Sequence, residues 1–178
     1  MSPMSPMSPM SPMSPIPAPP STPAATAATA ATAGHAPRPL PEPRSRYRHF
    51  SSITSRWADN DAYGHINNVV YYSYFDSVVN RYLIEADVLD VALSPVIGLV
   101  VETHCNYFSP LSFPQTVEAG LRVAHLGSSS VRYEIGLFAA GEPLCAACGH
   151  FVHVYVDRGT RRPTALPTRL TQTLQGLL

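Results

Sequence analysis

The sequence predicts an α+β domain in which an antiparallel sheet of five strands wraps around one central helix. Three observations support this fold class. Residues 67–86 form a mostly apolar segment of helical length, and five other segments are rich in apolar and β-branched residues, as strands are. Short connections separate the last four of these strands, which favours antiparallel hairpins. Such a sheet leaves an open edge, for which edge-to-edge dimerisation is the expected remedy.

A tail of different composition precedes the domain. Residues 1–44 repeat Met-Ser-Pro five times and continue in Pro, Ala and Thr, without an aromatic residue or an apolar period. This composition buries too little apolar surface to offset the chain entropy lost on folding. It also lacks the basic and apolar regions of a signal peptide and the Arg pattern of a transit peptide. We therefore expect a disordered tail over 1–44 and a domain over 45–178.

The expected elements follow one another along the domain. Residues 49–57 alternate and predict a first strand, and the turn-forming run 58–66 leads into the helix. Asn67 or its neighbour is the expected N-cap of this helix, because Asn is a preferred capping residue. Four strands are expected over 96–111, 115–127, 129–141 and 142–157, and a short amphipathic helix over 169–178.

The central helix carries only a narrow polar stripe, which includes Asp76 and Asn80. A mostly apolar cylinder of this kind is typical of a helix enclosed on several sides. We therefore expect Asp76 to be a buried hydrogen-bonding partner.

Charge and cysteine content exclude several classes of function. The chain has no lysine, and its 12 basic residues balance 12 acidic ones, so the basic surface of a nucleic-acid binder is not expected. No apolar stretch reaches the roughly 18–20 residues of a membrane helix, so no membrane partner is expected. Three cysteines, an odd count without an export signal, favour reduced thiols and a cytoplasmic location.

The run "CAACGHFVH" contains four residue types that bind zinc: Cys145, Cys148, His150 and His153. The same run reads as part of a strand, in which side chains alternate between faces. Cys148 and His150 would then face one way, and Cys145 and His153 the other. We therefore expect strand packing here and no metal site.

The run "DAYGHINN", from Asp61 to Asn68, lies between the first strand and the helix. Together with "VVETHCNYFSPLSFPQTVEAGLRVAHLGSSSVRYE" and "GHFVHVYVDRGTRRPTALP", it resembles the hotdog-fold acyl-CoA thioesterases of the 4-hydroxybenzoyl-CoA thioesterase type, over residues 48–170. The resemblance implies hydrolysis of an acyl-CoA thioester with Asp61 as the catalytic carboxylate. It implies no metal or redox cofactor, since coenzyme A is part of the substrate. It also implies a homodimer or homotetramer with sites built across the dimer interface.

The position of Asp61 suits this chemistry. It lies in the loop that leads to a helix N-terminus, where free N–H groups near Asn67 and Asn68 could form an oxyanion hole. Asp61 would act either as a nucleophile, through a mixed anhydride, or as a general base that activates water. The sequence leaves both routes open. Asp59, two residues earlier, is the competing candidate for the working acid.

Three further residues of the run have expected roles in the site. Gly64 supplies either a backbone conformation closed to other residues or close approach to the ligand. His65 orients the substrate or the loop, or else is a structural histidine. The resemblance places the backbone N–H of Asn68 against the thioester carbonyl.

Candidate substrate-binding residues lie further along the chain. Ser129 and Arg132, in the run from Gly127 to Arg132, are candidates for the phosphates of coenzyme A, although the run also reads as a hairpin turn. The resemblance implies that the strand 96–111 contributes to the site of the partner subunit. Glu102 is the candidate there, because it is costly to bury unless it is paired or lines a wet site. Tyr72 either lines the acyl pocket or fills the core.

Two other functions remain open at this stage. A thioesterase acting on acyl carrier protein would favour an arginine patch, and the sequence shows no strong one. A hotdog module that only binds an acyl group or only dimerises has little use for a carboxylate at Asp61, yet the fold alone does not exclude it.

Overall fold

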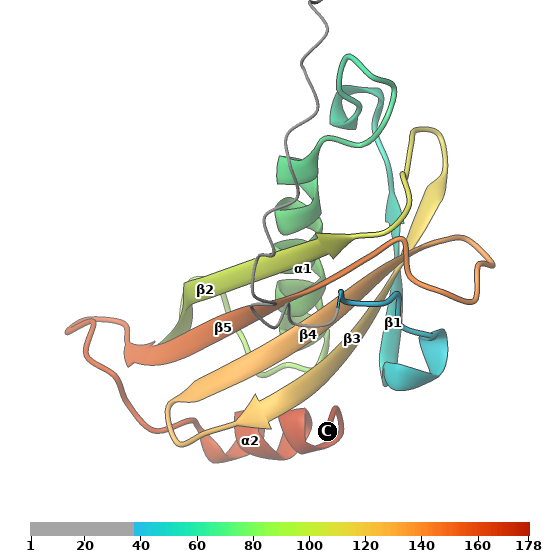
Figure 1. Ribbon diagram of the computed structural model, residues 1–178. Coiled ribbons are helices and arrows are strands. Elements are labelled where there is room, and N and C mark those ends of the chain that lie inside the picture. Colours follow the sequence, from blue (N-terminus) through green and yellow to red (C-terminus); the bar gives the residue numbers. More distant parts are fainter. Residues whose placement is uncertain (1–37) are drawn as a thin grey trace, which may run out of the picture. The chain divides into compact units, whose positions relative to one another are not determined.

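The computed structural model describes residues 38–178 of the chain (Figure 1). Its main helices and strands follow one another in the predicted order, with short 3-10 helices on either side of the first strand. In chain order the elements are η1 (Arg44–Arg46), β1 (His49–Thr54), η2 (Trp57–Asp59), α1 (Asn68–Glu85), β2 (Val96–Tyr107), β3 (Thr116–Leu126), β4 (Ser130–Ala139), β5 (Ala147–Asp157) and α2 (Thr168–Gln175). The predicted α+β class with a five-stranded antiparallel sheet is confirmed.

The strands are arranged in the order β1-β3-β4-β5-β2, and every neighbouring pair is antiparallel. The expected hairpins β3–β4 and β4–β5 are present. The expected hairpin between β2 and β3 is wrong, because β2 pairs with β5 at the far edge. The connection 108–115 has to cross three strand spacings, about 14 Å, and eight residues reach up to about 26 Å. A short connection was therefore compatible with either pairing.

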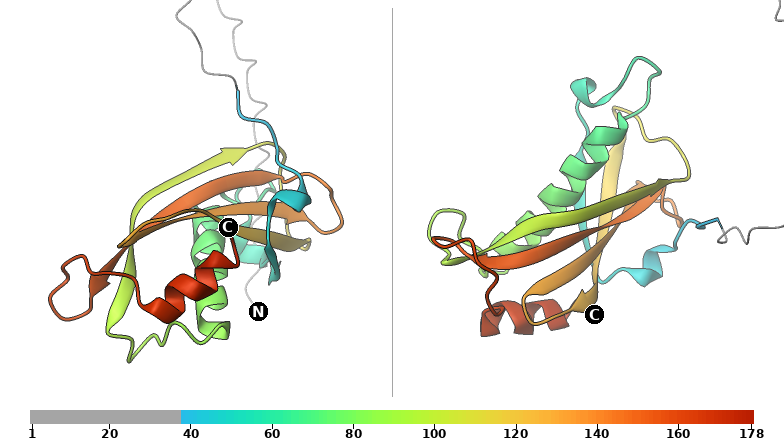
Figure 2. Two further views of the ribbon diagram at one scale, coloured as in Figure 1. Left: turned by 90° about the horizontal axis from the view of Figure 1, so that it is seen from below. Right: turned by 60° about the vertical axis from the view of Figure 1, so that its left-hand side comes forward.

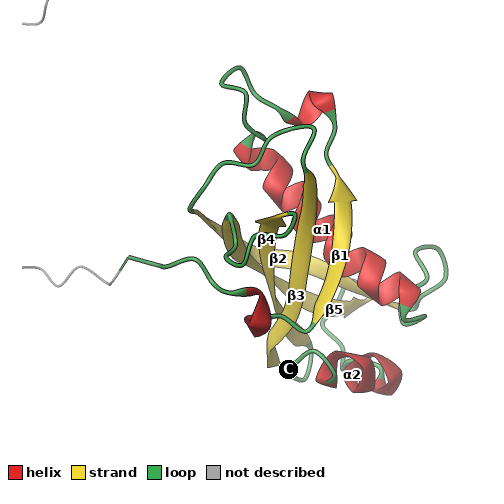
Figure 3. Ribbon diagram, turned by 90° about the vertical axis from the view of Figure 1, so that its right-hand side faces the viewer, coloured by secondary structure: helices red, strands yellow, loops and turns green. Residues whose placement is uncertain are grey.

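Helix α1 covers one face of the sheet (Figure 3). Asn67 is its N-cap as predicted, and the Asn67 side chain accepts a hydrogen bond from the Val69 amide at 3.1 Å. Phe75 and Val79 on α1 are fully buried against inward-facing strand residues such as Tyr133. No helix within residues 38–178 has both the length and the apolar character needed to cross a membrane.

The opposite flank of α1 is open in the single chain. Asp76 is exposed, and its Oδ1 accepts a hydrogen bond from Asn80 Nδ2 at 3.0 Å, within the same helix. The expectation that Asp76 is buried is therefore wrong for one chain. Val69 on the same helix is 63% exposed. An apolar residue in the sequence of α1 is therefore not necessarily buried in one chain.

The outer face of the sheet, away from α1, is covered by the segment that precedes β1. Tyr47 packs there with Phe138 and Cys145 in a second apolar cluster. Glu42 forms an ion pair with Arg122 at 2.6 Å. Within the segment that the sequence analysis assigned to the tail, Glu42 and Arg44 thus form ion pairs with residues of the sheet. The rest of the predicted tail, 1–37, lies outside the described residues.

Strand β5 begins later than the sequence suggests. It starts at Ala147, so Cys145 precedes the strand and packs on the outer face beside Cys148, rather than on the face of His153. His150 faces outward and bonds to Glu102, whereas His153 faces α1. Within the described residues, no group of three or more His, Cys, Asp or Glu side chains is placed to hold a metal ion.

Candidate active site

Asp59 lies in the segment between β1 and α1, and its side chain is buried, with only 1% exposed. The Asp59 carboxylate accepts hydrogen bonds from the backbone amide of Arg56 at 2.8 Å and from its guanidinium at 2.8 and 3.0 Å. It also accepts one from the hydroxyl of Tyr74 on α1 at 2.7 Å. Burial alone would raise the pKa of Asp59, but these hydrogen bonds outweigh it and lower the pKa below its ordinary value. Asp59 thus ties the loop to the helix.

Asp61 has a different environment, half-exposed and at the edge of a tight loop. Its Oδ1 accepts hydrogen bonds from the amides of Tyr63 at 2.8 Å and His65 at 3.4 Å. The Asp61 amide in turn donates to the His65 carbonyl at 2.8 Å. Among the described residues, no protein group donates to Oδ2. One carboxylate oxygen is therefore held by the loop while the other is available for chemistry.

Gly64 completes this loop with a φ of +81°. Its amide donates to the Asp61 carbonyl at 3.2 Å, which closes the turn. A Cβ at this position would meet no described atom within 4 Å. Of the two roles expected for Gly64, the structure therefore shows the left-handed backbone conformation, which other residues adopt only at a cost.

A pocket of ≈ 340 Å³ lies beside this loop and contains three of the four predicted catalytic residues. Asp61, His65 and Asn68 line it. Aromatic residues form another part of its wall, and the Tyr71 and Tyr107 rings pack edge to face with centroids 5.0 Å apart. The full lining is Asp61, His65, Ile66, Asn68, Tyr71, Tyr107, Phe108, Ser109 and Pro110.

The first turn of α1 offers this pocket one backbone donor rather than two. The Asn67 N–H donates to the Asp59 carbonyl at 2.8 Å, and the Val69 and Val70 amides are both used by Asn67, through its side chain and its carbonyl. The Asn68 N–H has no hydrogen-bond acceptor within residues 38–178. As the first residue of a helix, Asn68 has an amide that the helix itself does not satisfy. The sequence had grouped Asn67 with Asn68 as donors, and the structure separates them.

The other predicted substrate-binding residues do not join this pocket within one chain. Glu102 lies on the outer face, where it bonds to His150 Nε2 at 2.7 Å and lies 3.9 Å from Arg132. Ser129 lies in the β3–β4 turn, which Figure 2 shows near α2, at the other end of the domain from the loop before α1. Tyr72 packs against the edge of the core. A role for these residues stays a prediction that requires a partner subunit.

Sequence reasoning missed two features of the site. One is the Asp59–Tyr74 link, for which the only signal was an acidic residue close to an aromatic-rich helix. The other is the part of the wall formed by Ser109 and Pro110, which the sequence analysis assigned to the end of the expected strand 96–111. The first depends on the path of the loop that brings Asp59 to Tyr74. The second depends on contact between segments that are distant in the chain.

Comparison with solved structures finds the same fold in proteins of related sequence. The PA5185 protein of Pseudomonas aeruginosa strain PAO1 is 52% identical, with a TM-score of 0.76, and the match covers 78% of this chain and 96% of that one. A thioesterase from Thermus thermophilus, in complex with coenzyme A and Zn, is 30% identical, with a TM-score of 0.61, and 74% and 95% of the two chains are covered. The predicted hotdog fold is confirmed.

Sequence comparison gives a concordant result. Protein YsmA of Bacillus subtilis (strain 168) is 23% identical over 122 residues, which is 68% of this chain and 82% of that protein. The family model described as the thioesterase-like superfamily matches residues 55–174, a range that includes the loop, α1 and the whole pocket lining. The chain therefore belongs to the thioesterase-like superfamily.

Proposed function

We propose that this protein hydrolyses an acyl-CoA thioester to a carboxylic acid and coenzyme A, with Asp61 as the catalytic residue. One observation carries the proposal. The pocket at the start of α1 is lined both by Asp61, whose Oδ2 accepts no protein hydrogen bond within the described residues, and by Asn68, whose N–H has no protein acceptor there. A carboxylate beside a free helix-terminal donor is the minimum required to attack a carbonyl and stabilise the resulting oxyanion.

Two routes use these groups. As a general base, Asp61 takes a proton from water, the resulting hydroxide adds to the thioester carbonyl, and the oxyanion accepts a hydrogen bond from the Asn68 N–H. Collapse expels the thiolate of coenzyme A, which takes up a proton. As a nucleophile, Asp61 displaces the thiolate directly, and water then hydrolyses the mixed anhydride. Neither route draws on a metal or a further cofactor, so the proposal includes none.

The comparisons support coenzyme A as the leaving group. The Thermus thermophilus thioesterase that is 30% identical was solved with coenzyme A. Within the superfamily, we assign the chain to the 4-hydroxybenzoyl-CoA thioesterase type because of its Asp61–Asn68 run. The described Cys105, Cys145 and Cys148 are all free thiols, in keeping with the cytoplasmic setting that the proposal retains.

The test is hydrolysis of a panel of short, medium, long-chain and aromatic acyl-CoAs by the full chain. We expect turnover of at least one acyl class, and the preferred class names the substrate. Loss of thioester absorbance is the suitable readout, because the three free thiols would react with a thiol reagent. Acyl-CoA binding without turnover across the panel would favour the non-catalytic acyl-binding module instead.

The proposal includes a homodimer formed through β2. This strand is an edge of the sheet, and its apolar side chains are open to solvent, with Val101 62% and Val100 46% exposed. Pairing of β2 with the same strand of a second copy would satisfy its free backbone groups. It would also bring the α1 helix of the second copy near the open flank of the first. Glu102 or Arg132 could then contribute to the site of the partner subunit.

We expect the protein to sediment at twice its 19.3 kDa chain mass or at a multiple of that dimer mass. Val101→Arg should shift it towards the monomer, because two charged side chains would meet at the paired edges. Val91→Arg is the matched control, since Val91 is 72% exposed outside the sheet. Sedimentation of the wild type as a monomer at micromolar concentration would contradict the dimer.

A further inference from the structure

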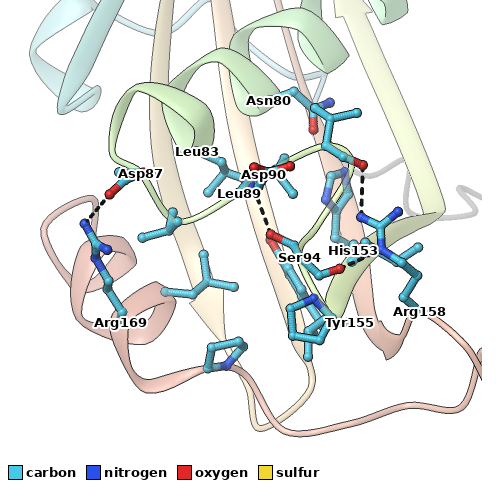
Figure 4. Close-up of a pocket in the computed structure, with 18 residues that line it drawn as sticks. Asn80, Leu83, Asp87, Leu89, Asp90, Ser94, His153, Tyr155, Arg158 and Arg169 are labelled. Atoms are coloured by element: carbon cyan, nitrogen blue, oxygen red, sulfur yellow. Dashed lines mark hydrogen bonds and ion pairs between the residues drawn. The ribbon is translucent and has the colours of Figure 1, made fainter.

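A second pocket lies at the other end of α1 from the Asp61 loop. We call it the α1–α2 pocket. It has a volume of ≈ 470 Å³ and is bounded by the C-terminal half of α1, the 87–95 segment, the start of β2, the end of β5 and α2. Figure 4 shows Leu83 of α1 and His153 and Tyr155 of β5 around this space. Its size is within the usual range of small-molecule sites. No residue of the Asp61 pocket contributes to it.

His153 is the unusual residue of this pocket. Its side chain is 3% exposed, and within residues 38–178 neither ring nitrogen has a protein hydrogen-bond partner. Its Nδ1 lies over Gly98, where an added Cβ would be only 2.8 Å away. Gly98 also lines the pocket, so the glycine keeps open the space beside this nitrogen. A buried polar group without a partner is costly, and such a group facing a pocket indicates a ligand.

The imidazole of His153 is neutral at neutral pH. Burial lowers the pKa of His153 to about 4, against a smaller opposing effect from the Asp76 carboxylate. A neutral imidazole has one N–H donor and one acceptor nitrogen. Either nitrogen can hydrogen-bond to a hydroxyl group, which both donates and accepts, whereas a bound cation or anion would lie in a poorly solvated space beside an uncharged ring.

The charged residues at the rim are already satisfied by one another or by the backbone. Asp87 pairs with Arg169 at 2.9 Å, and Arg158 donates to the carbonyls of Ser94 at 2.6 Å and Val91 at 3.0 Å. Asp90 accepts hydrogen bonds from two backbone amides at 2.8 Å. Two acidic and two basic side chains give the rim no net charge, so it does not select an ionic ligand.

We propose that the α1–α2 pocket is a binding site, separate from the Asp61 pocket, for a neutral and mostly apolar small molecule whose hydroxyl group hydrogen-bonds to His153. The apolar part of the ligand packs on side chains such as Leu83 and Leu170, which are each 3% exposed. The hydroxyl lies above Gly98. The ligand is either a free alcohol or a hydroxylated acyl group of a larger molecule.

The test compares two fluorinated probes that differ only in the hydroxyl: 4-(4-fluorophenyl)butan-1-ol and 1-butyl-4-fluorobenzene. Fluorine NMR titrations with the full chain give their affinities. We expect the alcohol to bind wild type more tightly than the hydrocarbon, by about three- to tenfold, the usual range for one hydrogen bond. His153→Phe should weaken alcohol binding to the level of the hydrocarbon and leave the hydrocarbon unchanged.

His125→Phe is the matched control, because His125 is an exposed histidine on β3 outside the pocket, and it should retain the preference. Gly98→Ala should weaken both probes, since its methyl group would enter the space beside Nδ1. Circular dichroism of each variant checks the fold. Equal binding of the two probes to wild type, or an unchanged preference in His153→Phe, would overturn the proposal.

A competition arm identifies the source of the ligand. The alcohol probe is bound to Asp61→Asn, and 4-hydroxybutanoyl-CoA is added, with coenzyme A alone as the control. Displacement by the acyl-CoA but not by coenzyme A assigns the pocket to the acyl group of an acyl-CoA bound at this second site, and retention of the probe assigns it to a free alcohol. The titrations need no turnover, so a failure of the thioesterase proposal leaves them interpretable.

Discussion

Asp61→Asn is expected to lower the kcat for acyl-CoA hydrolysis by at least about 100-fold, with little change in the fold. The amide side chain preserves the shape of the carboxylate, and its oxygen still accepts from the Tyr63 and His65 amides that now bond to Oδ1. It cannot take a proton from water or form an anhydride. The loss should therefore appear in kcat far more than in KM, measured by thioester absorbance over a range of substrate concentrations.

Asp157→Asn is the matched control for this change. Asp157 is also half-exposed, and its Oδ1 also accepts a backbone amide, that of Thr160 at 2.7 Å, but it lies at the end of β5 outside the Asp61 pocket. The kcat of the Asp157→Asn variant should equal that of wild type. If Asp61→Asn also retains full turnover, the catalytic group lies elsewhere and the assignment of Asp61 is wrong.

Asp59→Ala is expected to destabilise the protein by about 2–4 kcal/mol, an effect on folding rather than on chemistry. The substitution removes the acceptor of the buried Tyr74 hydroxyl and of the Arg56 amide, and both groups then lack their partner. Urea unfolding followed by circular dichroism measures the loss. Arg56→Ala should cost less, because the Arg56 side chain is 73% exposed. Equal stability of Asp59→Ala and wild type would contradict the structural role.

The same comparison should depend on pH in a defined direction. Because the pKa of Asp59 is lowered in the folded protein, its charged form stabilises the fold. This contribution is complete above the ordinary pKa of an unfolded aspartate, about 3.9. It is lost as the pH falls through the lower, folded-state pKa. The stability difference between wild type and Asp59→Ala should thus be constant from about pH 5 to 8 and should shrink in acid.

The sequence predicted the local features well because each rested on neighbouring residues. Asn67 caps α1 as expected, since a capping side chain reaches only to the next residues. The Asp61–Asn68 run likewise placed three residues in one pocket, because a short loop and the first helical turn are close by construction. The hairpins β3–β4 and β4–β5 follow from their short turns.

What the sequence could not predict depends on distant segments. The pairing of β2 with β5 decides which face Glu102 occupies, and residues 102 and 150 are far apart in the chain. The engagement of the Asn67 N–H depends on where the Asp59 carbonyl lies after the loop has folded. The α1–α2 pocket is assembled from five segments, so nothing near His153 in the sequence distinguishes it from an ordinary strand residue.

The buried link between Asp59 and Tyr74 also bears on the binding of the proposed substrate. It fixes the base of the loop to the helix, while the Asp61 carboxylate is two residues away at an accessible edge. The orientation of that carboxylate is thus fixed when the chain folds. The conformational entropy lost in ordering it is therefore not part of the free energy of substrate binding. A preorganised loop of this kind favours binding without induced fit. The association rate is then not limited by a closure of the loop.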